Sequence, residues 1–276
     1  MKTLEYRDAT PLKKEILNRD SLVITIDGST TAGKRVVAEK LADRYGLSVL
    51  ETGTTIRALA LLAIENNLVQ TDETNVTTVP VDFAEKIVDF YEHMPIKLTI
   101  EKPRSDERTA RIMVGNRDMR GELFTFRKQK AIDNLSSMIA ASDTLRKKLY
   151  GMWRSAVNEL GGAVVIGRKT GVDLFPDAPI KLYFFASPQA SAVYRVTHDP
   201  TATLRKTSEE LYVRERDLWE QGKGLLERPH DALAIDTSEY IMNGQKGLNL
   251  LEGRIEDFID SHFEIRGGQG RPHRGR

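Results

Sequence analysis

The sequence predicts a three-layer α/β fold in which helices cover both faces of a central parallel sheet. Continuous apolar runs recur along the chain, as is typical of strands that are buried on both faces. Segments with helical spacing separate these runs, so that successive strands are joined by crossover helices. The runs span residues 22–26, 48–50, 163–166, 180–186 and 233–235.

The first strand leads into a glycine-rich loop, which is the most informative feature of the chain. Gly28, Gly33 and Lys34 fit the pattern G-x-x-x-x-G-K, and an amphipathic helix follows them. Backbone N–H groups of such a loop, together with the helix N-terminus, form a site for phosphates. The order of elements therefore predicts a P-loop NTPase fold that binds ATP. We expect the nucleotide to contact Gly28, Ser29, Thr30, Thr31, Ala32, Gly33, Lys34 and Arg35.

The loop departs from its pattern at one position. A hydroxyl that binds Mg²⁺ is expected directly after the lysine, and this chain has Arg35 followed by Val36. Lys34 is expected to reach the β- and γ-phosphates. We therefore expect Mg²⁺ as a cofactor that phosphates and water hold, and we assign no residue of the chain as a metal ligand.

The remaining segments predict one domain with additions. Alternating strands near 96–101 and 111–114 indicate a small antiparallel insert, and a long helical region returns to the core. We expect an N-terminal extension with one short helix, and a basic, disordered tail. The expected parts are the extension (1–20), the domain (21–263), its insert (about 75–135), a charged lid (about 198–230) and the tail (264–276).

Composition excludes several classes of protein. The 276 residues are 40% hydrophobic and 29% charged with a net charge of +1, which is ordinary for a globular protein. The chain has no cysteine, which excludes disulfides, thiolate metal sites and cysteine nucleophiles. A polar N-terminus and the lack of an apolar run of about 20 residues predict a cytoplasmic protein without membrane contact. We expect a monomer, with weak attraction to RNA conceivable only through the tail.

Four further segments carry a resemblance to a known family. They are Leu50-Glu51-Thr52-Gly53-Thr54-Thr55-Ile56-Arg57-Ala58, Ile166-Gly167-Arg168-Lys169-Thr170-Gly171, Leu174-Phe175-Pro176-Asp177-Ala178, and Arg216-Asp217-x-x-Glu220-x-x-Lys223 with Asp231-Ala232-x-x-Ile235-Asp236-Thr237-Ser238 behind it. In order and spacing, the loop and these segments resemble the bacterial cytidylate (CMP/dCMP) kinase family over roughly residues 21–260. The resemblance implies ATP-dependent phosphorylation of a pyrimidine nucleoside monophosphate (NMP) to its diphosphate, with an NMP-binding insert and a lid.

The chemistry of phosphoryl transfer agrees with that resemblance. The reaction needs two anionic substrates to be aligned and their charge neutralised, for which arginine forks are suited. Arg57 and Arg168 each follow a predicted strand, at the sheet edge where ligands bind, and are expected to hold the acceptor phosphate. Lys34, Arg168 and the lid residue Arg216 are the expected catalytic residues. The resemblance adds Thr52, Ser137, Arg146, Lys169, Glu220 and Lys223 on the NMP side and Arg195 near the donor adenine.

Several of these positions depart from the family pattern. Lys169 replaces an aspartate that accepts a hydrogen bond from the cytosine amino group, whereas a lysine can only donate. One hypothesis is therefore that the acceptor carries a uracil-type or modified base. Ile56 and Lys223 also differ from the pattern, which leaves a second alternative open: a catalytically degenerate nucleotide-binding protein.

Each assignment has a structural alternative. The lid arginines can belong to a solvated helical face, Lys169 can point to solvent, and Ser137 can be an ordinary helix residue. Trp153 and Trp219 are predicted to be packing residues rather than stacking platforms.

Overall fold

The structure is a computed structural model that divides the chain into two compact units. It describes residues 14–72, 76–125, 129–198, 203–205, 207–209, 211–212 and 226–267. Residues 1–50 and 160–276 form one unit, which we call the sheet unit. Residues 51–159 form the other, the insert unit, which is larger than the predicted insert of about 75–135.

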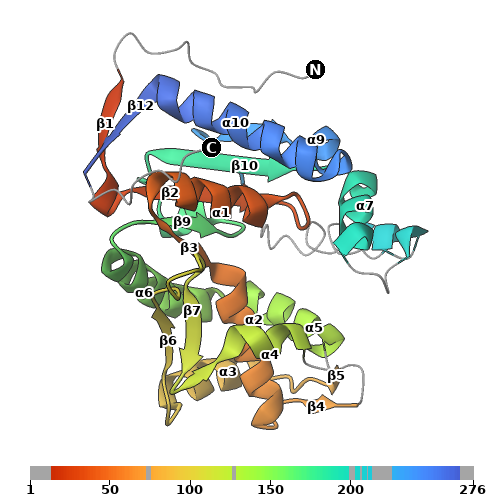
Figure 1. Ribbon diagram of the computed structural model, residues 1–276. Coiled ribbons are helices and arrows are strands. Elements are labelled where there is room, and N and C mark those ends of the chain that lie inside the picture. The colour runs from red at the N-terminus through yellow and green to blue at the C-terminus, as the bar shows by residue number, and fades with distance from the viewer. Residues whose placement is uncertain are drawn as a thin grey trace. The chain divides into compact units, whose positions relative to one another are not determined.

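A five-stranded sheet forms the centre of the sheet unit, with the strand order β11-β10-β2-β9-β3 (Figure 1). β10 pairs in parallel with β11 and β2, and β2 pairs in parallel with β9, which confirms the predicted parallel sheet. Every predicted core strand is present. The strands are β2 (Val23–Gly28), β3 (Ser48–Glu51), β9 (Ala163–Ile166), β10 (Ile180–Phe185) and β11 (Leu233–Asp236).

Helices pack against this sheet through regularly spaced apolar residues. α1 (Lys34–Tyr45) and α10 (Gly244–His262) contact one another and share a core with the strands (Figure 1). The buried residues of α10 include Leu251, Ile255 and Ile259, which recur at intervals of four and therefore share one face. α7 (Pro188–His198) and α9 (Ser238–Met242) pack together through a smaller apolar cluster.

The two ends of the described chain form a small sheet that the sequence did not predict. β1 (Glu15–Asn18) pairs in parallel with β12 (Phe263–Arg266), and a 3₁₀ turn (Arg19–Ser21) follows β1. The expected disorder of the tail is therefore wrong for residues 264–266. Residues 1–13 lie outside the described part of the chain, so the short helix expected in the extension stays a prediction. Only Leu17 of β1 is buried, so the strand shows no alternating pattern, and its partner is remote in sequence.

The insert unit contains helices and two small antiparallel sheets. β6, β7 and β8 form one sheet and β4 and β5 the other, as the alternating pattern predicted for β6 and β7. The helices are α2 (Thr52–Glu65), α3 (Phe83–His93), α4 (Met119–Thr125), α5 (Gln129–Ala141) and α6 (Asp143–Leu160). The strands are β4 (Gln70–Thr71), β5 (Val76–Thr78), β6 (Leu98–Glu101), β7 (Arg111–Val114) and β8 (Arg117–Asp118).

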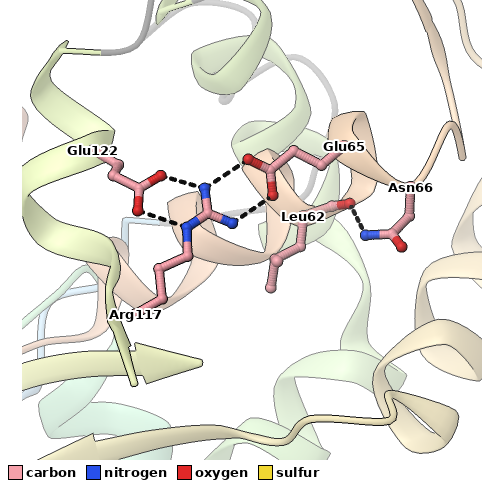
Figure 2. A network of polar contacts seen from close by, with 5 residues as sticks. All are labelled: Leu62, Glu65, Asn66, Arg117 and Glu122. Carbon is pink, nitrogen blue, oxygen red and sulfur yellow. Dashed lines mark hydrogen bonds and ion pairs between the residues drawn. The ribbon is translucent and has the colours of Figure 1, made fainter. Parts of the chain in front are cut away.

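Helix α2 is the centre of the insert unit and is held from two sides. Trp153 of α6 is buried and donates its indole N–H to Thr55 of α2 over 3.1 Å, in agreement with its predicted packing role. Near the end of α2, Arg117 forms ion pairs with both Glu65 and Glu122 (Figure 2). Its two terminal nitrogens donate to the Glu65 carboxylate over 2.8 and 2.7 Å, so one guanidinium joins α2, β8 and α4.

Among the described residues, no helix combines the length and the apolar character that a membrane crossing requires.

Candidate active site at the phosphate-binding loop

The loop begins at the end of β2 with a glycine that no other residue can replace without movement. Gly28 has a φ of +131°, and a Cβ atom placed on it would lie 1.8 Å from the carbonyl oxygen of Phe184. The next residue, Ser29, donates its backbone N–H to that same oxygen over 3.0 Å. The neighbouring strand β10 therefore fixes the first turn of the loop.

The other end of the loop is the N-terminus of α1. Gly33 is the N-cap residue and makes no side-chain cap hydrogen bond, so no side chain of the cap covers the first N–H groups of this 12-residue helix. Lys34 Nζ donates to the carbonyl oxygens of Gly28 and Ser29, the first of these over 3.0 Å. The lysine thus lies across the loop, whose N–H groups and ammonium suit an anionic ligand.

Arg168 lies next to the phosphate loop. It follows strand β9 by two residues, and its Nη2 donates to the Thr30 hydroxyl over 2.6 Å. The sequence placed Arg168 at the same sheet edge as the loop, but it did not indicate this direct contact. Two cationic side chains, those of Lys34 and Arg168, therefore donate hydrogen bonds to the same loop.

The sequence analysis missed a buried carboxylate beneath the loop. Asp27, the residue before Gly28, has no exposed surface. It accepts hydrogen bonds from the backbone N–H and hydroxyl of Thr170, over 2.8 and 2.9 Å, and from the N–H of Gly171 over 2.7 Å. Burial raises the pKa of Asp27, while these hydrogen bonds and the charge of Lys34 act against that rise. The signal was present as a charged residue at the end of an otherwise apolar run.

Lys169, the residue that departs most from the family pattern, is paired with a carboxylate. Its Nζ lies 2.9 Å from Glu227 Oε2, and 21% of its side chain is exposed. Lys169 therefore does not simply point to solvent.

Arg35 forms an ion pair along its own helix. Its Nε lies 3.1 Å from Glu39 Oε1, and Tyr194 of α7 is close enough to interact electrostatically with both residues. Burial raises the pKa of Tyr194. Arg195, the residue expected near the adenine, is the next residue of α7 and is half-buried.

The residues of this site do not match the donor set that Mg²⁺ prefers. Neither Arg35 nor Val36 offers an oxygen after Lys34, and Thr30 already accepts a hydrogen bond from Arg168, which leaves the buried Ser29 hydroxyl as a single neutral oxygen of the loop without a hydrogen-bond partner. Across the described ranges, no group of three or more histidine and acidic side chains is placed to hold a metal ion.

The insert unit brings two of its predicted residues to one place. Arg57 lies on α2, in the second turn of the helix rather than directly after a strand, and is paired with Asp133 of α5. Ser137 donates its hydroxyl to the backbone oxygen of Asp133 over 3.1 Å. Asp133 is therefore a shared partner of Arg57 and Ser137, although Ser137 is also bonded as an ordinary helix serine would be.

The other predicted residues of the insert unit are Thr52 and Arg146. Thr52 is buried as the first residue of α2. Arg146 lies on α6, where it is paired with Asp143, and its Nε is buried without a hydrogen-bond partner. Arg216, Glu220, Lys223 and Trp219 lie outside the described residues.

Comparisons with known proteins match most of the chain. The family model "Cytidylate kinase" matches residues 24–244. The cytidylate kinase of Shewanella pealeana is 30% identical over 222 residues, which cover 78% of this chain and 87% of that protein. That of Klebsiella pneumoniae (strain 342) is 29% identical over 221 residues, covering 79% and 88%. The cytidylate kinase of Streptococcus mutans is 26% identical over 241 residues, covering 86% and 97%.

Proposed function

The chain belongs to the cytidylate kinase family, and on that premise we propose that it transfers the γ-phosphoryl group of ATP to CMP or dCMP. An oxygen of the acceptor phosphate attacks the γ-phosphorus, the bond to the bridging oxygen of ADP breaks, and a nucleoside diphosphate forms. No general base is needed, because the attacking phosphate oxygen is already anionic at neutral pH. The protein has to align the substrates and neutralise their charge.

The observation that supports this proposal most strongly is the convergence of two cations on one loop. Lys34 lies across the loop and Arg168 donates to Thr30 within it. A phosphate bound by the loop N–H groups would meet both cations, and charge that develops on the transferring group would be stabilised by the arginine fork.

The residues proposed to bind the acceptor monophosphate belong to the insert unit and to the lid segment. Arg57 is the proposed ligand of the acceptor phosphate, with Ser137 and Arg146 directed to the base. The buried Nε of Arg146 offers a hydrogen-bond donor for such a ligand. Glu220 and Lys223 are proposed to contribute from the lid, as Arg216 is.

The proposed base is cytosine rather than uracil. The uracil hypothesis required the Lys169 ammonium as a free donor, but Glu227 accepts from that ammonium at 2.9 Å. The paired site offers carboxylate oxygens as well as a donor, so the argument against an amino-bearing base no longer holds.

Mg²⁺ is expected to enter as a complex with ATP. Because the residues after Lys34 offer no oxygen ligand, no step is assigned to a protein–metal contact.

A panel of monophosphates in an assay of ADP release tests the proposal. With ATP as donor, CMP and dCMP should be phosphorylated faster than UMP, dUMP or dTMP. Preference for a uracil-type base would restore the alternative acceptor. Tight ATP binding without turnover on any member of the panel would instead favour the degenerate nucleotide-binding protein.

Two lysines on α1 supply a matched pair of variants. Lys34→Ala should lower kcat with CMP by about 10²-fold or more, because a cation at the transferring group is lost. Lys40→Ala should leave kcat unchanged, since Lys40 is exposed and lies 3.9 Å from Glu252. Equal activity of both variants would contradict the assignment of the loop.

A further inference from the structure

Burying the carboxylate of Asp27 costs hydration free energy, and the fold by itself does not require a charged residue at this position. Asp27 is the penultimate residue of β2, the central strand of the sheet, and is fully enclosed. A charge enclosed in this way is expensive unless several hydrogen bonds compensate its lost hydration. Three donors do so, and all of them belong to two successive residues, Thr170 and Gly171.

The segment that supplies these donors is the one that carries Arg168. Gly167 donates its N–H to the oxygen of Ile26 over 3.2 Å, so the chain leaves strand β9 still attached to β2. Asp27 then holds the chain again at Thr170 and Gly171. Arg168 therefore lies between two attachments to the strand that leads into the phosphate loop.

Gly171 has no room for a side chain, which keeps the segment close to Asp27. A Cβ atom on Gly171 would lie 2.8 Å from the Thr25 hydroxyl oxygen and 3.0 Å from Pro229 Cγ. The π-helical turn that starts at Thr170 is thus packed closely against side chains of β2.

We propose that Asp27 is a positioning residue, which fixes the Arg168 guanidinium beside Thr30 of the phosphate loop by holding the backbone of residues 170–171. The inference rests on the proposed function, because it assigns Asp27 an effect on phosphoryl transfer through Arg168. A displacement of about 1 Å at a catalytic group can cost about 10²-fold in rate, so this attachment matters for kcat.

A double-mutant cycle separates this role from a merely structural one. Asp27→Asn keeps the size of the side chain but places an amide where Gly171 N–H needs an acceptor. In the otherwise unchanged protein, we expect kcat with CMP to fall by about 10²-fold. In an Arg168→Ala background, the same substitution should lower kcat by less than about threefold, because the residue through which it acts is gone.

The control is an exposed acid of the sheet unit that is paired with a buried lysine. Asp231 lies 2.6 Å from Lys181, whose side chain is 5% exposed, at the opposite end of β10 from the loop. Asp231→Asn should lower the melting temperature but change kcat little in either background. Equal losses of kcat for Asp27→Asn with and without Arg168 would overturn the inference.

Milder variants keep the test decisive if Asp27→Asn does not fold. Thr170→Val removes only the hydroxyl donor and should lower kcat several-fold. Thr170→Ser keeps a hydroxyl donor and should retain the kcat of the unchanged protein. A Thr170→Val variant with unchanged kcat would contradict the inference.

Failure of the proposed function is distinguishable from failure of the inference. Amide exchange of residues 167–171 should rise in whichever variant folds, even if no monophosphate is turned over. Unchanged exchange would overturn the positioning role by itself. If Arg168→Ala retains full kcat, the role of Arg168 fails and the inference with it, while Lys34→Ala still tests the kinase activity.

Discussion

Thr31 adopts a left-handed conformation in the middle of the phosphate loop. Its φ is +58°, and its hydroxyl donates to the Thr30 carbonyl oxygen over 2.6 Å. This conformation costs about 1–2 kcal/mol for a residue with a Cβ atom, and a β-branched side chain makes it less favourable still. The loop therefore contains backbone strain at the site where ligand binding is proposed.

Thr31→Gly should stabilise the protein by about 1 kcal/mol, because glycine removes the clash and only part of the gain is lost to the freer unfolded chain. Thr31→Ala removes the β-branch but retains the Cβ atom, so it should stabilise the protein less than Thr31→Gly does. Urea unfolding of both variants measures the difference. A Gly variant that is less stable than the Ala variant would contradict the strain.

Arg35 stands where the loop pattern has a hydroxyl residue, and this determines whether the protein by itself can bind Mg²⁺. Since the loop offers no hydroxyl after Lys34, the protein without nucleotide should not bind Mg²⁺ measurably. Adding millimolar Mg²⁺ or EDTA should leave its melting temperature unchanged, whereas ATP binding should still respond to Mg²⁺. A metal-dependent shift without nucleotide would reveal a protein ligand that the described residues do not provide.

At the scale of elements, Arg117 joins a helix end, a strand and a second helix in the insert unit (Figure 2). The hydrogen bond from Arg117 holds the pKa of Glu122 below its ordinary value of 4.5. A carboxyl group whose pKa is lowered by folding contributes stability above its unfolded pKa. That contribution is lost as the pH falls through the folded pKa.

Glu122→Gln should therefore lower the free energy of unfolding by about 0.5–1 kcal/mol at pH 7, a value kept small because 40% of the Glu122 side chain is exposed. The difference from the unchanged protein should shrink below about pH 4.5 and vanish once the carboxyl is protonated in both states. Asp106→Asn, at an exposed position of the same unit, is the control. A difference that persists at pH 2–3 would show a packing effect instead.

Arg19 connects the small terminal sheet to the first helix. It follows β1 and donates to the backbone oxygens of Tyr45 and Gly46, where α1 ends. The last carbonyls of a helix lack intrahelical partners, so a cation there satisfies them and also interacts favourably with the helix dipole.

Arg19→Ala should cost about 1 kcal/mol of stability, measured by urea unfolding, with unchanged kcat. Arg266→Ala is the matched control on the paired strand, where the arginine pairs with the exposed Glu264 and should matter less. Equal losses would argue that loss of charge, rather than the helix end, causes the effect.

At the scale of the whole molecule, the proposed nucleotides should act on different units. An ATP analogue should slow amide exchange in the loop and at the start of α1, within the sheet unit. CMP should slow exchange around Arg57 and Arg146, within the insert unit. Hydrogen–deuterium exchange by mass spectrometry measures both effects, and protection of the insert unit by ATP alone would contradict this division of roles.

Local patterns predicted much of the fold. The apolar runs located every strand of the parallel sheet, and the glycine spacing located the loop, because burial on both faces and a tight phosphate turn each demand particular residues in consecutive positions. The same kind of signal failed for β1, whose four residues bury a single leucine.

The sequence by itself determined the α/β class, the phosphate loop and the family to which the chain belongs, since those depend on residues close together or in fixed order. Only the tertiary structure decided that Arg168 contacts Thr30, that Glu227 pairs with Lys169, and that Asp27 holds the turn at Thr170. These contacts join residues on separate elements, and their distances follow from how the strands pair rather than from any local pattern. The physical reason is that a buried charge is stable only where distant parts of the chain bring donors to it.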